Sequence, residues 1–293
     1  MVSCAPALFP LMSVAESLSA AHYFTPGLAR LPCPGAAALL PQVQRLLIEK
    51  GFLQTPHPLS ELHRVLPPSD TVLDENYFNA VTRAFYVQDD ALHTAYYQLL
   101  RELRRDHLPQ DFVFQRAPIF RFHFPAPFVG KLRTRSGFGL QQHSDTLGGH
   151  PFELLQGWVP LTDCAGSAAL HIAPLPDSIV ILQEVYALLS HDDGAFRAGL
   201  DSFYALRDRE PGLQRALIAA CQPQAMSLGE VLLFDPRCVH GGVENDSDRT
   251  RVSLDFRLMP LPVYERFIAS PHSSQHPRFR RGDIFHSATI DQL

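Results

Sequence analysis

The sequence has few cysteines and no long apolar run. Only five of its 293 residues are cysteine, and no two of them form a CxxC pair. Their odd number and irregular spacing favour neither a disulfide framework nor a zinc ribbon, so a reducing cytoplasm is the expected compartment. No stretch reaches about 18 uninterrupted apolar residues, the length that a membrane-spanning helix needs, and we expect no membrane span.

Positive charge is also in short supply. The chain has 25 Lys and Arg against 30 Asp and Glu, a formal net charge of −5. Nothing in this balance attracts a phosphate backbone, and no aromatic residues alternate with basic ones, so nucleic acid is not an expected partner. The one local basic cluster, HPRFRRGD near the C-terminus, is typical of a solvated tail.

The N-terminal stretch lacks the pattern of a signal peptide. It is apolar, but its first basic residue is Arg30, Glu16 lies inside it and prolines interrupt it. A signal peptide combines a basic start with an unbroken apolar segment. We therefore expect no secretory leader.

The remaining composition is that of a folded protein with many turns. Hydrophobic residues make up 46% of the chain, charged residues 19%, and there are 25 prolines. No internal repeat and no linker marks a second domain, so we expect a single domain over residues 1–293. We divide it into a helical N-terminal part at about 1–117, a barrel at about 118–260 and a C-terminal tail at 261–293.

Two N-terminal segments carry helical spacing. Residues 37–51 end at Gly51, a residue type that commonly terminates helices in the left-handed conformation. Residues 89–107 have an apolar stripe, aspartates at the start and arginines near the end, as the helix dipole favours. These helices are predicted to support a β domain, and a further helical insertion is expected at about 178–220.

After Pro118 the chain changes to short strand-like runs separated by Gly, Pro, Asn and Asp. Such runs are typical of an antiparallel β domain. Two groups of strands around a polar interior predict a mainly β fold with flanking helices (α+β), a double-stranded β-helix or jelly roll of cupin-like architecture. The expected strands are 119–124, 137–145, 152–162, 167–173, 229–235 and 250–259.

Three residues in two distant stretches could bind one metal ion. In QQHSDTLGGH, His143 and Asp145 are two positions apart, so on a strand they point to the same face. In LGEVLLFDPRCVHGG, His240 follows the end of another strand. Two imidazoles and one carboxylate form the facial ligand set of non-haem Fe(II) sites and leave three positions open. An HxD pair alone is weak evidence, because most such pairs are surface polar residues.

The strand RVSLDFR alternates polar and apolar residues, which places Arg251, Ser253, Asp255 and Arg257 on one face. A barrel strand with a polar face turned inward needs a polar ligand inside. Arg251 with Ser253 beside it can hold a carboxylate through two parallel hydrogen bonds and a hydroxyl. The alternative interpretation is a structural ion pair between Arg251 and Asp255.

Together these stretches resemble the Fe(II)/2-oxoglutarate-dependent dioxygenases, within them the phytanoyl-CoA hydroxylase-like group and the related oxygenases of antibiotic and amino-acid biosynthesis. The resemblance covers about residues 118–258. The chain departs from the group at IAPLPDS, where a PGSH stretch is usual, on the substrate side of the site. The motifs that carry the resemblance are HSD (143–145), WVPLTD (158–163), GSAALHIAP (166–174), GEVLLFDPRCVHGGVEN (229–245) and RVSLDFR (251–257).

The resemblance implies that His143, Asp145 and His240 bind Fe(II), and that Arg251 and Ser253 hold the co-substrate 2-oxoglutarate. With O₂ as the oxidant, such an enzyme oxidises an unactivated C–H bond of a small molecule by hydroxylation, desaturation or ring formation. The expected setting is the biosynthesis of a specialised metabolite or a modified amino acid. Because Asp145 is present, halogenation is disfavoured.

The candidates for substrate binding are Arg121, Trp158, Asn245 and Arg257. The resemblance places Asn245 at a position that shapes the site. Arg121 can face the barrel interior or form a structural pair, and Arg257 can anchor substrate or pair with Asp255. Trp158, the only tryptophan, can form a wall of the iron site or fill the core. His150 and His171 are set aside, because three protein ligands already complete the metal site.

Two rival functions stay open at this stage. A cupin-type metalloenzyme that does not use 2-oxoglutarate would give Arg251 no role. A non-enzymatic barrel would bind a ligand and keep the metal residues as a remnant. Neither the substrate, the carbon that is oxidised nor the oligomeric state follows from the sequence.

Overall fold

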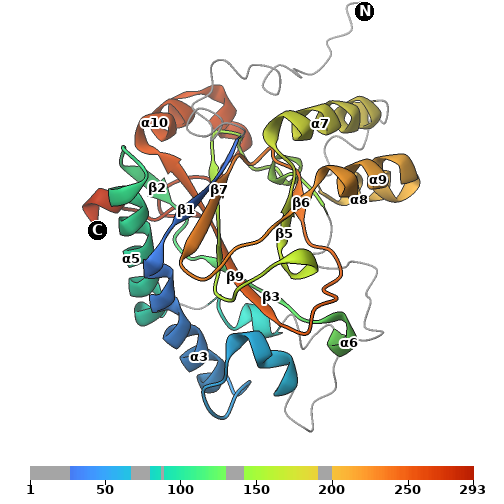
Figure 1. The fold of residues 1–293 in the computed structure, drawn as a ribbon. Helices are drawn as coiled ribbons and strands as arrows, with labels where there is room; N and C mark the ends of the chain where they lie inside the picture. Colours follow the sequence, from blue (N-terminus) through green and yellow to red (C-terminus); the bar gives the residue numbers. More distant parts are fainter. Residues whose placement is uncertain (1–26, 67–79, 87–88, 130–141, 191–199) are drawn as a thin grey trace, which may run out of the picture.

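A computed structural model describes residues 27–66, 80–86, 89–129, 142–190 and 200–293. In this part of the chain, a six-stranded and a three-stranded sheet are surrounded by helices (Figure 1). All strand pairs within the two sheets are antiparallel. The predicted combination of helices with antiparallel β-structure is therefore confirmed, whereas closure into a jelly-roll barrel stays a prediction.

The larger sheet has the strand order β1-β7-β4-β9-β2, and β3 also pairs with β9. The smaller sheet has the order β6-β5-β8. The strands of the larger sheet are β1 (Leu28–Pro32), β2 (Phe112–Phe114), β3 (Ile119–His123), β4 (Leu155–Pro160), β7 (Glu230–Phe234) and β9 (Arg251–Pro260). Those of the smaller sheet are β5 (Leu170–Ile172), β6 (Gln222–Gln224) and β8 (His240–Gly241).

The central strand β9 has the two-residue alternation predicted for it. Its apolar residues join a hydrophobic cluster with the N-terminal helices, and they are Val252, Leu254, Phe256 and Leu258. The intervening polar residues share the opposite face with their partners on neighbouring strands, since directly paired residues lie on the same side of a sheet. Arg251 is paired with His123, Ser253 with Arg121, and Asp255 with Trp158. This polar face is the floor of the candidate site.

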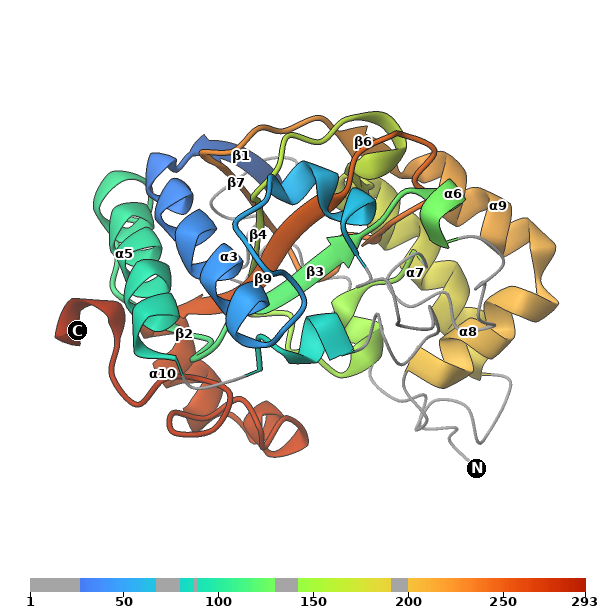
Figure 2. The same cartoon turned by 90° about the horizontal axis from the view of Figure 1, so that it is seen from below.

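Helices cover the two sides of the β-structure. Figure 2 shows α3 and α5 together on one side of the large sheet, and α7, α8 and α9 grouped on the other. The α-helices are α3 (Leu39–Glu49), α5 (Asp90–Asp106), α6 (Ala126–Val129), α7 (Leu175–Ser190), α8 (Leu200–Arg209), α9 (Pro211–Ala220) and α10 (Leu261–Ala269). The 3₁₀ helices are η1 (Pro34–Ala38), η2 (Leu59–Arg64), η3 (Asp145–Gly148), η4 (Gly166–Ala168), η6 (Pro271–Gln275) and η7 (Ile290–Gln292).

The two predicted N-terminal helices are confirmed, together with the residue that ends the first and the residue that caps the second. After α3, Gly51 takes the left-handed conformation with φ 77°, which a glycine adopts without steric cost. At the start of α5, the Asp89 side chain accepts a hydrogen bond from the backbone N–H of Leu92 at 2.8 Å. This bond satisfies one of the free donors of the first turn.

The strand expected at 137–145 is not found in its described part. Residues 137–141 lie outside the described residues, and His143 forms only an isolated bridge. Asp145 begins the 3₁₀ helix η3 instead, because the Ser144 side chain caps it by accepting from the N–H of Thr146. The other expected strands overlap β3, β4, β5, β7 and β9.

Arg278 and Arg280 of the basic cluster are exposed, as expected of solvated charges, but the apolar residues of the C-terminal segment pack against the protein. Phe285 is fully buried and Ile290 is 2% exposed. Arg104 on α5 forms an ion pair with Asp291 at 2.9 Å, and Arg101 donates to the backbone oxygen of Leu293 at 2.7 Å. Apolar residues spaced among the charges fix this segment to the body of the protein.

Within the described ranges, no helix is long and apolar enough to cross a membrane. The four cysteines in these ranges are free thiols, and Cys4 lies outside them.

Candidate metal centre

Two histidines are brought together by the backbone. His143 and His240 form an antiparallel bridge in which each N–H donates to the other's carbonyl oxygen at 2.8 Å. Residues paired in this way project to the same side. The imidazole ring centres are consequently 4.7 Å apart. A backbone contact between residues ninety-seven positions apart in the chain (240 − 143) thus places both rings side by side next to β8 of the smaller sheet.

Asp145 reaches the same point through a turn. Its N–H donates to the carbonyl oxygen of Pro236 at 3.1 Å, and the Ser144 hydroxyl donates to that same oxygen at 2.9 Å. The turn ends at Gly149, which has φ 78°. The i, i+2 spacing therefore works as predicted, but through the start of η3 and not through strand alternation.

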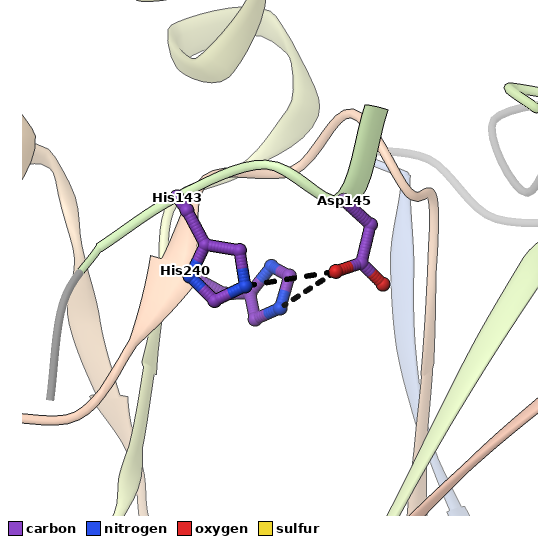
Figure 3. Close-up of side chains that lie close together, drawn as sticks. All are labelled: His143, Asp145 and His240. Atoms are coloured by element: carbon purple, nitrogen blue, oxygen red, sulfur yellow. Dashed lines mark ion pairs between the residues drawn. The ribbon is translucent and has the colours of Figure 1, made fainter. Parts of the chain in front are cut away.

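The three side chains converge on one point (Figure 3). The Asp145 Oδ1 atom lies 3.6 Å from His143 Nε2 and 3.9 Å from His240 Nε2. One ligand atom from each residue lies within 4.8 Å of the other two. These separations suit three ligands on one face of an ion, since metal–nitrogen and metal–oxygen bonds are about 2.0–2.2 Å long. The residues present therefore fit a divalent metal.

His240 has the protonation state that a metal requires. Its Nδ1–H donates to the carbonyl oxygen of Cys238 at 2.9 Å, which leaves the Nε2 lone pair for a ligand bond. Burial, with His143 nearby, lowers the pKa of His240 to about 4. The ring is therefore neutral at pH 7 and needs to lose no proton when a metal binds.

Asp145 is held as a carboxylate by a network on its far side. Burial would raise its pKa, but His150, His143 and Arg257 together lower it well below its usual range. His150 Nδ1 lies 3.3 Å and Arg257 Nη2 3.6 Å from Asp145 Oδ2. Arg257 also donates from Nη1 to Gln115 Oε1 at 3.0 Å.

This network differs from the sequence interpretation in two respects. One interpretation of the sequence paired Arg257 with Asp255. In the structure, Arg257 instead contacts Asp145, Gln115 and His150. His150 was set aside from the sequence, yet it lies against the carboxylate. Gly149 provides the signal that could have indicated it, because a left-handed turn after a short helix brings the next residue back towards the start of that helix.

Arg251 is a buried cation with two unpartnered donors. The side chain is 7% exposed, and neither its Nε nor its Nη1 has a hydrogen-bond partner among the described residues. The hydroxyl of Ser253, on the same face of β9, is buried and unpartnered as well. Burial lowers the pKa of Arg251 to about 10, so it is still charged at pH 7. A charge in this state requires an anionic partner.

The surroundings of Arg251 place it on the interior face between the sheets. Its guanidinium lies over the Trp158 ring, 5.7 Å from the ring centre. Burial lowers the pKa of His171, and the charge of Arg251 contributes a smaller lowering. Burial lowers the pKa of both His240 and Arg251, and the charge of Asp255, on the same face of β9 as Arg251, acts against this lowering in both. The polar face of β9 that carries Arg251 therefore lies near the three-residue cluster.

Arg121, not Arg251, is the partner of Asp255. Arg121 Nε donates to Asp255 Oδ2 at 2.8 Å. The strand register pairs Arg121 with Ser253, and Asp255 is the next residue on the same face of β9. The ion pair between Arg251 and Asp255, which was the alternative interpretation, is therefore absent between these two described residues. This leaves the donors of Arg251 available.

Asn245 fixes a loop. Its amide nitrogen donates to the carbonyl oxygens of His123 at 3.2 Å and Arg249 at 2.9 Å. Its amide oxygen accepts from both the N–H and the hydroxyl of Ser247. These four bonds hold the loop before β9 against the end of β3. Direct contact of Asn245 with substrate stays a prediction.

The buried pair Asp235–Arg237 was not singled out from the sequence. Both side chains are 0% exposed, and two guanidinium nitrogens of Arg237 donate to the two oxygens of Asp235 at 2.8 and 2.7 Å. The pair closes the turn between β7 and His240. Its signal was the motif FDPRCVH, in which two opposite charges interrupt an otherwise apolar stretch.

Comparison with curated proteins finds one relative with a partial match. No family model matches the chain. The chain is 28% identical over 184 residues to the streptomycin biosynthesis protein StrG of Streptomyces griseus. The match covers 62% of this chain and 64% of StrG, which is less than two thirds of the relative.

Several solved structures are also similar. The non-haem monooxygenase ThoJ in complex with nickel has 15% identity and a TM-score of 0.42, covering 82% of this chain and 76% of ThoJ. The non-haem α-ketoglutarate-dependent carbocyclase SnoK from nogalamycin biosynthesis has 12% identity and a TM-score of 0.41, covering 82% and 83%. HygX from Streptomyces hygroscopicus, with nickel and 2-oxoglutarate bound, has 12% identity and a TM-score of 0.40, covering 80% and 83%.

Proposed function

We propose that this protein is an Fe(II)- and 2-oxoglutarate-dependent oxygenase that oxidises an unactivated C–H bond of a small molecule. The reaction is a hydroxylation, a desaturation or a ring formation. The relative StrG is described as a streptomycin biosynthesis protein, and this supports a specialised metabolite as the substrate class.

The observation that carries the proposal is the pairing of a metal-binding cluster with a buried, unpartnered cation. His143, Asp145 and His240 offer three ligand atoms within 4.8 Å of one another. On the polar face of β9, Arg251 and Ser253 offer buried donors that have no partner within the described part of the chain. A metalloenzyme that needs no anionic co-substrate gives this buried guanidinium no role, whereas a dicarboxylate satisfies it.

Each group has a defined task in this proposal. His143, Asp145 and His240 would hold Fe(II), and Arg251 with Ser253 would hold the distal carboxylate of 2-oxoglutarate. When bound, iron and 2-oxoglutarate supply the oxidising power for O₂-dependent attack on a C–H bond. The protein orients the two groups and limits the access of water, since the Asp145 and His240 side chains are only 11% and 12% exposed.

The substrate side is proposed to lie next to Arg121 and Tyr204. The charge of Asp145 contributes to the pKa of both residues, which indicates their proximity to the metal cluster. Asp255 holds Arg121 and raises its pKa, so Arg121 is a fixed cation. It could orient a substrate that carries an anionic or hydrogen-bond-accepting group.

The test is a screen of candidate metabolites for succinate formation coupled to O₂ uptake. The protein would be loaded with Fe(II) under nitrogen and mixed with 2-oxoglutarate, O₂ and each compound. We expect Fe(II)-dependent succinate release with at least one compound, and its loss in His143→Ala. Turnover without 2-oxoglutarate would indicate a cupin-type metalloenzyme of another class. Metabolite binding without any turnover would indicate a binding protein.

A further inference from the structure

A second pair of histidines lies in the C-terminal part of the chain, outside the cluster of His143, Asp145 and His240. His272 is in η6 and His276 follows directly after it, four residues on. The segment folds back against the loop that connects η3 to β4, where it meets Gly149 and Glu153. Neither histidine has a task in the proposed reaction.

The hydrogen bonds of this pair determine which nitrogens carry protons. His272 Nδ1 lies 3.1 Å from Glu153 Oε1, and His276 Nδ1 lies 2.8 Å from the carbonyl oxygen of Gly149. A carboxylate and a carbonyl oxygen can only accept, so both Nδ1 atoms are protonated donors. The Nε2 atom of each neutral ring therefore has a free lone pair.

These two lone pairs face each other. His272 Nε2 and His276 Nε2 are 3.0 Å apart. Two acceptors at this distance repel unless a cation lies between them, and the cation can be a shared proton or a metal ion. A shared proton is held best when N–H···N is nearly linear, and the ring centres, 4.6 Å apart, are too close for both rings to point along that line.

The ring geometry fits one metal ion. Two imidazole nitrogens about 2.1 Å from an ion, at the angle of about 90° found in tetragonal or octahedral coordination, lie about 3.0 Å apart. Because a ring nitrogen is about 1.15 Å from its ring centre, the same arrangement places the centres about 4.6 Å apart. The observed separations are 3.0 Å between the nitrogens and 4.6 Å between the ring centres.

The surroundings also match those of metal ligands. A histidine that binds a metal usually donates its other N–H to a carboxylate or a backbone carbonyl. His272 has the carboxylate of Glu153 and His276 has the carbonyl of Gly149. Phe152 stacks on the His272 ring with 5.0 Å between ring centres and fixes its orientation. The His272 side chain is 25% exposed, so solvent can complete the coordination.

We propose that His272 and His276 form a second metal site, which binds a divalent transition-metal ion such as nickel or copper through their Nε2 atoms. Imidazole pairs suit zinc, copper, nickel and cobalt better than magnesium or calcium. With two protein ligands the site binds more weakly than a four-ligand structural site. A bound ion would fasten the C-terminal segment to the loop that starts at Asp145, and the site is independent of the proposed oxygenase activity.

The test is the nickel stoichiometry of the untagged, chelator-treated protein by isothermal titration calorimetry. Wild type should bind two ions per chain, one at each site. His272→Ala/His276→Ala should bind one, and His143→Ala/His240→Ala should retain one. Glu153→Gln should weaken the second site by about 10- to 100-fold, the usual effect of losing an outer hydrogen-bond partner. His107→Ala, a histidine at the end of α5, is the matched control and should still bind two.

A second measurement does not depend on the folding of the His272 and His276 variants. Copper(II) bound to His143→Ala/His240→Ala should show electron paramagnetic resonance couplings to two imidazole nitrogens. Absence of nitrogen coupling would overturn the proposal. Equal nickel stoichiometry in wild type and a folded His272→Ala/His276→Ala would overturn it as well, and would assign the close nitrogen contact to a shared proton.

Discussion

At the scale of single residues, the buried guanidinium of Arg251 is the feature that most restricts the function. In the part of the chain that the structure describes, its Nε and Nη1 have no partner, and the Ser253 hydroxyl beside it has none either. A charge-assisted hydrogen bond contributes about 1.5–3 kcal/mol, and about 1.4 kcal/mol is a factor of ten in affinity. Arg251→Ala should therefore weaken 2-oxoglutarate binding by roughly 10- to 100-fold and leave metal binding nearly unchanged.

Arg251→Lys is the matched variant for this prediction. It should recover only part of the affinity, because an ammonium keeps the charge and lacks the two parallel donors. The measurement is the dissociation constant of 2-oxoglutarate for the Fe(II) protein without oxygen. An unchanged constant in Arg251→Ala would move the carboxylate anchor to Arg121 or Arg257.

Arg257 acts on the metal centre through Asp145. It lies 3.6 Å from the oxygen of Asp145 that faces away from the two histidines, and it is held in place by Gln115. Removal of such an outer contact typically lowers metal affinity by about 10- to 100-fold. We expect this loss in Arg257→Gln, measured by cobalt titration, and none in the control Arg280→Gln, whose side chain is exposed. Equal cobalt affinity in Arg257→Gln and wild type would show that Asp145 needs no support from Arg257.

The burial of His123 should make the free energy of unfolding depend on pH. Burial, with the charge of Arg251 nearby, lowers the pKa of His123 to about 3, from an ordinary value of 6.5. As the pH falls below 6.5, the unfolded chain takes up a proton that the folded chain does not. The contribution of His123 to the free energy of unfolding is complete above pH 6.5. It is lost progressively towards pH 3, by at most about 1.4 kcal/mol per pH unit.

Urea unfolding at pH 7.5 and 5.5 measures this effect. Wild type should lose about 1.4 kcal/mol more of its unfolding free energy between these values than His123→Gln does, since the window is about one unit below 6.5. His123→Gln can be less stable at both values, because the prediction concerns only the difference between them. If both proteins had the same pH dependence, His123 would not be buried in the neutral form.

At the scale of elements, the contact of β4 with β9 depends on one glycine. Gly157 in the middle of β4 is paired with Phe256, and the Phe256 ring occupies the space that a Cβ atom would take. The ring belongs to the core between the sheet and the N-terminal helices. The glycine therefore allows an aromatic side chain to lie across the neighbouring strand.

Gly157→Ala should destabilise the protein by about 1–3 kcal/mol, the usual cost of overpacking a core. Gly212→Ala is the matched control, because a Cβ atom there meets nothing within 4 Å. In α9 this change should be neutral or slightly stabilising, since alanine favours helix more than glycine does. Chemical denaturation compares the two variants, and equal stabilities would contradict the packing argument.

At the scale of the whole molecule, features that local sequence patterns determine could be predicted better than contacts between distant residues. The alternation in RVSLDFR predicted both faces of β9, and the caps of α3 and α5 followed from Gly51 and Asp89. These features depend on neighbouring residues alone. The grouping of His143, Asp145 and His240 could also be predicted, because the types and spacing of the ligands restrict the chemistry.

The contacts that the sequence did not reveal depend on register and on turns. Asp255 pairs with Arg121 because of the offset between β3 and β9, which no local pattern specifies. His150 meets Asp145 because Gly149 reverses the chain after η3. The C-terminal segment packs through Phe285 and Ile290, which are spaced too irregularly among polar residues to show a period.

The most direct test of the central claim is an anaerobic titration of the Fe(II) protein with 2-oxoglutarate, followed by visible absorption. If His143, Asp145 and His240 hold the iron and Arg251 directs the co-substrate to it, a metal-to-ligand charge-transfer band should grow to saturation at one 2-oxoglutarate per chain. His143→Ala should show no band at the same concentrations. A wild-type protein that binds one Fe(II) per chain and never develops the band would contradict the account.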